Sequence, residues 1–152
     1  MKLCGLISVV ILLLIGCSKE PETLVRSGYD ETAMNAAIER ARKEVDQFLK
    51  VLAANDADSF SVKAPITDKN GTEHFWLTDV RYANGEFTGK IGNDPGIIEN
   101  VKMGQDWKIK KNEISDWMFV RGERIHGGYT IDPLLPTMDE ARANEMRRKL
   151  VR

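Results

Sequence analysis

Hydrophobic and polar positions follow a helical period in the first part of the chain. Between Met34 and Leu52, apolar residues recur at steps of four and three, at positions 34, 38, 41, 45, 48 and 52. This spacing gathers them on one face of an α-helix, and Asp30 stands where an N-cap residue is expected. The stripe is too short for a strong coiled-coil prediction. It therefore predicts an amphipathic helix that packs its apolar face on a sheet.

From Ser59 the period changes to two, which is typical of half-buried strands. Phe60, Val62, Ala64 and Ile66 alternate with more polar neighbours up to an Asn-Gly turn signal at residues 70 and 71. A second turn signal at residues 83–85 separates two further β-rich stretches. The pattern predicts strands over residues 59–66, 72–82, 86–91 and 106–111, and the second and third of these should form a hairpin.

The C-terminal third gives weaker signals. Residues 113–120 are compatible with a short helix or a strand, and residues 127–130 are expected to open a last short strand. Thr137-Met138-Asp139-Glu140 matches a capping box, which predicts a helix to about Arg148 with a basic end. We therefore expect an α+β fold over residues 30–152. It comprises a small antiparallel sheet or partly open barrel of about four to five strands, with an N-terminal and a C-terminal helix.

Composition limits the size and the class of the protein. The 152 residues include 22 Lys and Arg against 23 Asp and Glu, without a long basic run. This length allows one ordinary globular domain. Nucleic-acid binding is disfavoured because it normally requires a clustered basic surface, so we expect no nucleic-acid partner.

The N-terminus has the pattern of an export signal. Lys2 precedes an apolar run from Leu3 to Ile15, which is shorter than the roughly 20 residues of a membrane-spanning helix. Leu14-Ile15-Gly16-Cys17 resembles the bacterial lipobox. We expect a signal peptide over residues 1–16, lipidation of Cys17 and a flexible tether over residues 17–29. The alternative is a plain secretory peptide or an uncleaved anchor in which Cys17 is incidental.

Lipidation would determine both the location and the thiol chemistry of the mature chain. Several acyl chains hold a protein firmly on a bilayer, so the expected location is the cell membrane after export. Ser18 after the cysteine favours the periplasmic face of the outer membrane in an organism that has one. Cleavage removes Cys4 and acylation consumes the thiol of Cys17, which excludes disulfides, cysteine nucleophiles and cysteine-rich zinc sites.

Few residues suggest chemistry. The two histidines, His74 and His126, are not spaced as a metal-binding pair, so we predict no metal site and no cofactor. His74 shares a strand face with Trp76, which would form a protonatable patch beside an aromatic ring. Asp116 is a possible helix cap, turn acceptor or catalytic carboxylate. Ser115 lacks the glycine-rich context of an activated serine.

Aromatic residues and a glycine pair complete the candidates. The three tryptophans, at positions 76, 107 and 117, are expected either to fill the core or to line an apolar groove. Gly127-Gly128 is better explained by turn geometry than by phosphate binding. No catalytic residue is assigned. The candidate binding residues are His74, Trp76, Asp116, Trp117 and Tyr129.

Six short motifs also carry a family resemblance. In order, they are Glu73-His74-Phe75-Trp76, Phe87-Thr88-Gly89, Asn93-Asp94-Pro95, Lys102-Met103-Gly104, Ile114-Ser115-Asp116-Trp117-Met118 and Gly127-Gly128-Tyr129-Thr130. Together they resemble the YegJ-like bacterial family over about residues 45–135. Phe75 departs conservatively from the methionine frequent in that family. The resemblance implies a compact α+β domain of unknown function, found in lipoproteins among other contexts.

Three functions follow as hypotheses. The first is a membrane-anchored envelope module that binds a peptide, protein or cell-wall ligand around His74, Trp76, Asp116 and Trp117. The second is an immunity-type protein that neutralises a toxin at the membrane, through the helix at residues 34–52 or a sheet edge. The third is an acid/base enzyme with His74 and Asp116 as its titrating pair. The expected partners are the bilayer, through Cys17, and an unknown envelope ligand.

Overall fold

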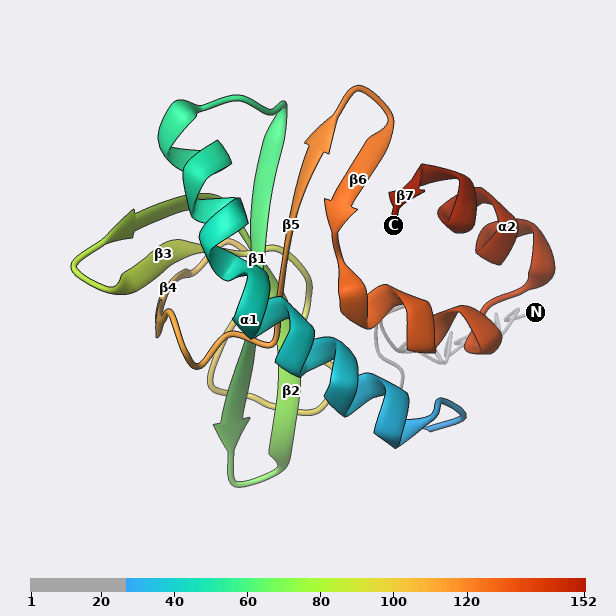
Figure 1. Cartoon of the computed structure of the whole chain (residues 1–152). Helices are drawn as coiled ribbons and strands as arrows, with labels where there is room; N and C mark the ends of the chain where they lie inside the picture. Colours follow the sequence, from blue (N-terminus) through green and yellow to red (C-terminus); the bar gives the residue numbers. More distant parts are fainter. Residues whose placement is uncertain (1–26) are drawn as a thin grey trace, which may run out of the picture.

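The computed structural model describes residues 27–152 (Figure 1). The predicted signal peptide, Cys17 and most of the predicted tether lie outside these residues. Within residues 27–152, no helix is long and apolar enough to cross a membrane. The elements are, in order, α1 (Glu31–Ala54), β1 (Ser59–Asp68), β2 (Gly71–Ala83), β3 (Glu86–Ile91), β4 (Asp106–Lys110), β5 (Asp116–Arg121), β6 (Arg124–Gly127), the 3-10 helix η1 (Tyr129–Thr137), α2 (Glu140–Lys149) and β7 (Leu150–Val151).

Helix α1 forms as the apolar stripe predicts. The Asp30 carboxylate accepts hydrogen bonds from the backbone N–H groups of Thr32 and Ala33, at 2.8 and 3.1 Å, and so caps the first turn. The helix ends at Asn55, which adopts a left-handed conformation with φ of 49°. The buried members of the stripe are Ala41, Val45 and Phe48, which belong to the core shared with the sheet. The predicted cap and packing face are confirmed.

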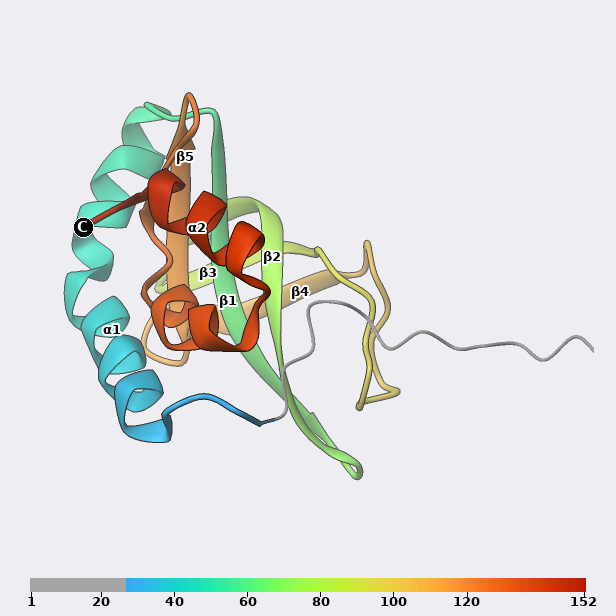
Figure 2. The same cartoon turned by 90° about the vertical axis from the view of Figure 1, so that its right-hand side faces the viewer.

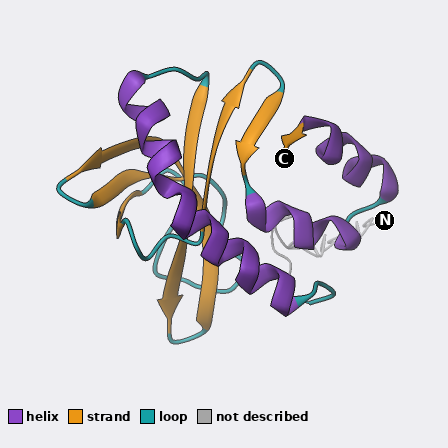
Figure 3. Cartoon of the chain, in the orientation of Figure 1, coloured by secondary structure: helices purple, strands orange, loops and turns teal. Residues whose placement is uncertain are grey.

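The predicted α+β class is also confirmed, but the sheet is larger than expected. Within residues 27–152 it has seven strands in the order β4-β3-β2-β1-β5-β6-β7, and it remains open rather than closing into a barrel (Figure 3). All neighbours are antiparallel except β6 and β7. The expected four to five strands are too few because β6 and β7 have four and two residues, which are too short to show an alternating pattern.

The C-terminal third differs from the prediction in two further details. Residues 127–130 do not open a strand, since β6 ends at Gly127 and η1 begins at Tyr129. The N-cap of α2 is Asp139, which accepts a hydrogen bond from Arg142 N at 2.9 Å. The Thr137 hydroxyl instead donates to Leu134 O, at the end of η1. The 3-10 turn therefore uses the threonine that sequence alone assigns to the capping box.

The two faces of the sheet have different surroundings. Figure 2 shows α1 along one side of β1, β2 and β5. We call the opposite side the far face. Register places Lys63 of β1 directly between Trp76 of β2 and Asp116 of β5. Since their neighbours Val62, Phe75 and Trp117 are buried in the core with α1, these three side chains project from the far face.

A close backbone approach at Gly127 brings β6 onto β5. The residue has φ of 77°, and a Cβ there would lie within about 2.5 Å of two ring carbons of Trp117. The next residue, Gly128, donates its backbone N–H to Trp117 O at 2.8 Å. The glycine pair is thus a turn that packs against a tryptophan, as the turn interpretation predicts. This turn sends the chain from β6 into η1.

Candidate functional site

Six residues with charged, hydrogen-bonding or aromatic side chains lie on or beside the far face, and we call them the far-face cluster. They come from β1, β2, the start of β5 and the first turn of η1. Sequence reasoning named three of them as binding candidates and placed two on one face. The members of the cluster are Lys63, His74, Trp76, Ser115, Asp116 and Thr130.

Asp116 forms the base of this cluster. Its side chain is 0% exposed and its carboxylate accepts four hydrogen bonds. Oδ1 accepts from the backbone N–H groups of Trp117 and Tyr129, at 2.8 and 3.2 Å. Oδ2 accepts from the backbone N–H and the hydroxyl of Thr130, at 2.8 and 2.7 Å. Of the roles proposed from sequence, this geometry corresponds to the turn acceptor.

Burial shifts the pKa values of Asp116 and Lys63 in opposite directions. Desolvation by burial raises the pKa of the Asp116 carboxyl above its ordinary value, although the Thr130 and Trp117 hydrogen bonds and the charge of Lys63 act against this rise. Burial lowers the pKa of the Lys63 ammonium, and the charge of Asp116 opposes that change. The two groups therefore stabilise each other's charged forms across the far face.

Lys63 is the charged member of the cluster that the sequence did not indicate. Its Nζ donates to Thr130 Oγ1 at 3.1 Å and lies 5.4 Å from the centroid of the Trp76 ring. The position of the ammonium over the ring is a cation–π contact. The attraction in such a contact is stronger when the ammonium and the indole are partly removed from water. Alternation in β1 does place Lys63 opposite the apolar face. The alternation does not indicate that Thr130 of η1 would lie within hydrogen-bond distance of the Lys63 ammonium.

His74 reaches toward the same region from β2. Its Nδ1 lies 2.9 Å from Ser115 Oγ, and the Ser115 hydroxyl donates to Lys63 O at 3.2 Å. A hydroxyl has one proton to donate. The imidazole must therefore donate from Nδ1–H to Ser115, which leaves Nε2 as an acceptor. Ser115 itself is 1% exposed and is held by this bonding as a structural hydroxyl.

Trp117, another predicted binding residue, lies on the α1 side of the sheet. It is 2% exposed, and its indole N–H donates to Ala41 O of α1 at 2.8 Å. Its ring lies 5.5 Å from that of Phe48 and 6.2 Å from that of Phe119, measured between centroids. Aromatic contacts of this kind stabilise a core. The structure therefore separates Trp117 from the far-face cluster.

Tyr129 is likewise directed toward α1. Its hydroxyl donates to Glu44 Oε2 at 2.5 Å, and the Arg40 guanidinium lies 4.2 Å from its ring centroid. Burial and the hydrogen bond to Glu44 raise the pKa of Tyr129 to about 12. Only its backbone N–H takes part in the far-face cluster, through Asp116. The side chain joins η1 to α1.

Two recesses lie outside the core. A cleft of about 550 Å³ lies between α1 and the β3 and β4 strands, and it includes Arg42, Glu86 and Lys111 in its lining. A groove of about 960 Å³ follows the strands beyond the far-face cluster, where its lining includes Ser61 and Thr78. Among residues 27–152, no group of three or more His, Cys, Asp or Glu side chains is arranged to hold a metal ion.

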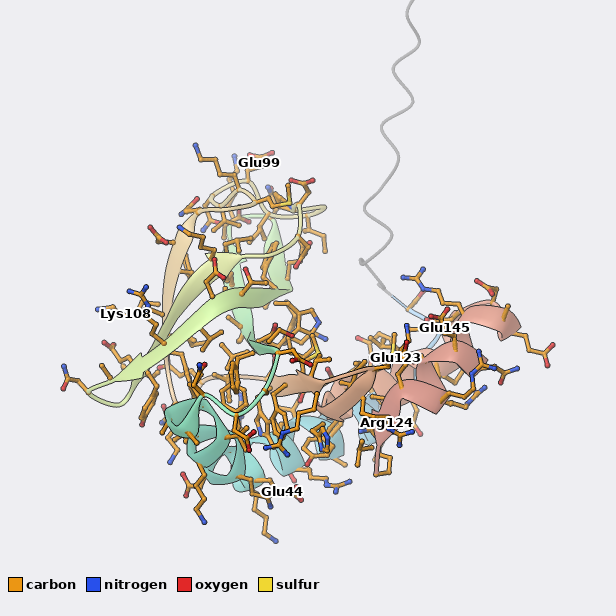
Figure 4. All side chains as sticks on the ribbon, turned by 90° about the horizontal axis from the view of Figure 1, so that it is seen from above. Glu44, Glu99, Lys108, Glu123, Arg124 and Glu145 are labelled. Carbon is orange, nitrogen blue, oxygen red and sulfur yellow. The ribbon has the colours of Figure 1, made fainter. Side chains whose placement is uncertain are left out.

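Charges of both signs are distributed around the molecule. Figure 4 shows Glu44 on the α1 side, Glu99 on the opposite side, and Lys108 on β4 away from both. Near α2, Arg124 and Glu145 lie at the end of the molecule farthest from Lys108 (Figure 4). The labelled charges of both signs are thus spread over the molecule in this view.

The four bonds to Asp116 predict a large effect of an isosteric change. Asp116→Asn turns one oxygen into an NH2 donor, and either orientation places it against two existing donors. We expect a loss of about 3 kcal/mol in the free energy of unfolding, measured by urea denaturation of the full-length chain. Thr130→Val, which removes the hydroxyl's bonds to Asp116 and Lys63 but keeps the backbone N–H bond, should cost about 1.5 kcal/mol. Equal stability of Asp116→Asn and the parent would contradict this role.

The surroundings of His74 predict a depressed pKa. Although the residue as a whole is exposed, desolvation by the surrounding protein atoms, together with the nearby charges of Lys63 and Arg42, lowers the pKa of His74 to about 4. Because this value is below the unfolded one, the neutral ring's contribution to stability is complete above about pH 6.5 and is lost as the pH falls through 4. An NMR titration of the His74 ring should therefore give a midpoint well below 6.5.

The control for this titration is His126→Gln, which assigns the two histidine signals. The free energy of unfolding of the parent, relative to His74→Gln, should fall between pH 6.5 and 4 because the unfolded state then binds more protons. A midpoint at or above 6.5 would indicate a stabilised imidazolium, as an ion pair with Asp116 requires.

The sequence is similar to a family of bacterial proteins and to individual bacterial proteins. The family described as "Uncharacterized protein conserved in bacteria (DUF2314)" matches residues 31–150. The chain is 57% identical to Uncharacterized protein YegJ of Escherichia coli (strain K12) over 151 residues, which cover 99% of both chains. No solved structure matches it.

A second relative is more distant and longer. The putative ankyrin repeat protein NMB1133/NMB1171 of Neisseria meningitidis serogroup B is 32% identical over 122 residues, or 74% of this chain and 48% of that protein. The family match extends beyond the 45–135 region of the resemblance and includes α1, the sheet and α2. The YegJ-like resemblance is confirmed: the chain belongs to the bacterial DUF2314 family.

Proposed function

We propose that this protein is a lipid-anchored module of the bacterial envelope that binds a ligand on the far face of its sheet without catalysing a reaction. Anchoring rests on the apolar run of residues 3–15 and the lipobox-like residues 14–17. Binding rests on the geometry of the far face. The observation that carries it is the cluster of a partly buried lysine, a partly buried tryptophan and an exposed histidine beside a groove.

The arrangement favours binding over acid/base catalysis. A general acid or base must come within hydrogen-bond reach of the group that it protonates or deprotonates. Asp116 is fully buried and its two oxygens already accept four bonds, so it is unavailable as the partner of His74 in proton transfer. Lys63, Trp76 and His74 remain as groups that contact solvent. They offer a charge, an aromatic surface and an acceptor, which are recognition elements.

The far face is also better suited to recognition than helix α1. The apolar stripe of α1 is occupied by the core, where Ala41, Val45 and Phe48 are buried. A toxin-neutralising role through this helix would have to use its charged outer side. Isolated exposed charges contribute little to affinity. We therefore place the ligand on the far face.

The anchor is tested by metabolic labelling with radioactive palmitate. We expect the parent chain to incorporate label and to fractionate with membranes, because acylation of the Cys17 sulfur supplies the chains that bind the bilayer. Cys17→Ser should remove the label. The matched control is Cys4→Ser, which changes the other cysteine of the chain and should leave labelling intact. Undiminished label in Cys17→Ser would refute lipidation at this residue.

Ligand binding is tested with the full-length chain and detergent-solubilised envelope of the source bacterium. Saturable binding is expected for the parent, with at least a ten-fold loss of affinity in Trp76→Ala. The control is Met103→Ala, which removes another large apolar side chain, 56% exposed and outside the far-face cluster. Circular dichroism should show that both variants stay folded. Equal binding by Trp76→Ala and the parent would exclude the far face.

A further inference from the structure

The Lys63 ammonium has unused hydrogen-bonding capacity. In the part of the chain that the structure describes, its one acceptor is Thr130 Oγ1, and no carboxylate forms an ion pair with it within 4.0 Å. An ammonium has three donor hydrogens. Removing a cation from water is costly unless an anion or further acceptors compensate for the lost hydration. The Lys63 ammonium can therefore donate hydrogen bonds to an anionic group of a ligand.

Asp116 does not supply that group, although its charge lies near. All four of its bonds go to Trp117, Tyr129 and Thr130. The Thr130 hydroxyl stands between the two charges, because it donates to Asp116 Oδ2 and accepts from Lys63 Nζ. This relay fixes the position of the ammonium. It leaves the remaining ammonium hydrogens free to contact a ligand.

His74 adds an acceptor beside the cation. Its Nδ1–H is used by Ser115, so Nε2 presents a lone pair, and this nitrogen makes no hydrogen bond within residues 27–152. The residue is exposed, and a ligand can reach it. A neutral acceptor next to a cation matches a ligand in which an N–H donor lies close to an anionic oxygen.

Trp76 and the groove determine the shape of the ligand. The indole ring lies beneath the Lys63 ammonium and provides a flat apolar surface. Two residues farther along the same strands, Ser61 and Thr78 begin the groove of about 960 Å³, whose lining continues to Lys90 and Asp106. Hydroxyls and charges of both signs line it together with the apolar side chains of Phe60, Val80 and Trp107. Such a mixed wall suits an extended peptide, with its polar backbone and varied side chains, better than a compact apolar molecule.

We propose that the far-face cluster binds the free C-terminal carboxylate of a peptide. The carboxylate contacts the Lys63 ammonium, the N–H of the terminal residue donates to His74 Nε2, and the terminal side chain packs on Trp76. The preceding residues follow the groove. This inference rests on the proposed binding function and specifies its ligand class.

A phosphate group fits this site less well. Phosphate sites usually combine several donors, such as arginines or successive backbone N–H groups. Here one cation is accompanied by an acceptor, His74 Nε2, at a position where a phosphate site would have a further donor. A peptide terminus instead provides one carboxylate and one adjacent donor. The arrangement of charge and acceptor therefore distinguishes the two anions.

The test is an NMR titration of the full-length chain in detergent micelles. N-acetyl-alanyl-alanine is compared with its C-terminal amide and with inorganic phosphate, and the indole N–H signal of Trp76, assigned with Trp76→Phe, is the readout. We expect a saturable shift with the carboxylate peptide, at least ten-fold weaker binding of the amide, and no competition by equimolar phosphate. The comparison of carboxylate with amide requires no variant to fold.

Variants then locate the interaction. Lys63→Met should weaken binding of the carboxylate peptide at least ten-fold, whereas Lys50→Met, at an exposed position on α1, should leave it unchanged. Equal binding of peptide and amide, tighter binding of phosphate, or unchanged binding by Lys63→Met would overturn the proposal. If envelope binding is still lost in Trp76→Ala, the ligand class alone has failed. If that binding is also absent in the parent, the proposed function has failed with it.

Discussion

The buried carboxylate of Asp116 is the interaction on which the arrangement of this protein depends. It joins the first residue of β5 to the first turn of η1, across the β5–β6 hairpin. A carboxylate removed from water is strongly destabilising unless its lone pairs are satisfied. Four donors satisfy them here: two are backbone N–H groups in the first turn of η1, one is the backbone N–H of Trp117 in β5, and one is the Thr130 hydroxyl. The turn after β6 and the charge therefore stabilise each other.

Adjacent residues of β5 connect this turn to both faces of the sheet. Because side chains alternate along a strand, Trp117 points to α1 while Asp116 points to the far face. Trp117 donates to Ala41 O of α1, and a Cβ on Gly127 would collide with its ring. Asp116 orients Thr130, which in turn positions Lys63. Packing of the core and geometry of the candidate site are thus coupled through two consecutive residues.

The sequence predicts the elements with long periodic patterns and misses those defined by distant contacts. Helix α1 has six apolar residues in register, whereas β7 has two residues that pair only after α2 has returned to β6. The candidate site follows the same rule. Alternation places His74 beside Trp76, and applied to β5 it also places Asp116 and Trp117 on opposite faces. Lys63 is separated by 67 residues from Thr130, so no local pattern indicates their contact.

Because Thr130 separates the buried Asp116 carboxylate from the partly buried Lys63 ammonium, the far face keeps a positive charge with free donors. A direct ion pair between Lys63 and Asp116 would satisfy both groups and leave little for a ligand. With Thr130 between them, Asp116 lowers the cost of keeping Lys63 charged but does not occupy its donors. Strands β1, β2 and β5 hold Lys63, Trp76 and Asp116 in register. Binding at the proposed site would therefore require little reorganisation of the backbone, and its affinity would depend on how well a ligand replaces the water around one ammonium and one imidazole nitrogen.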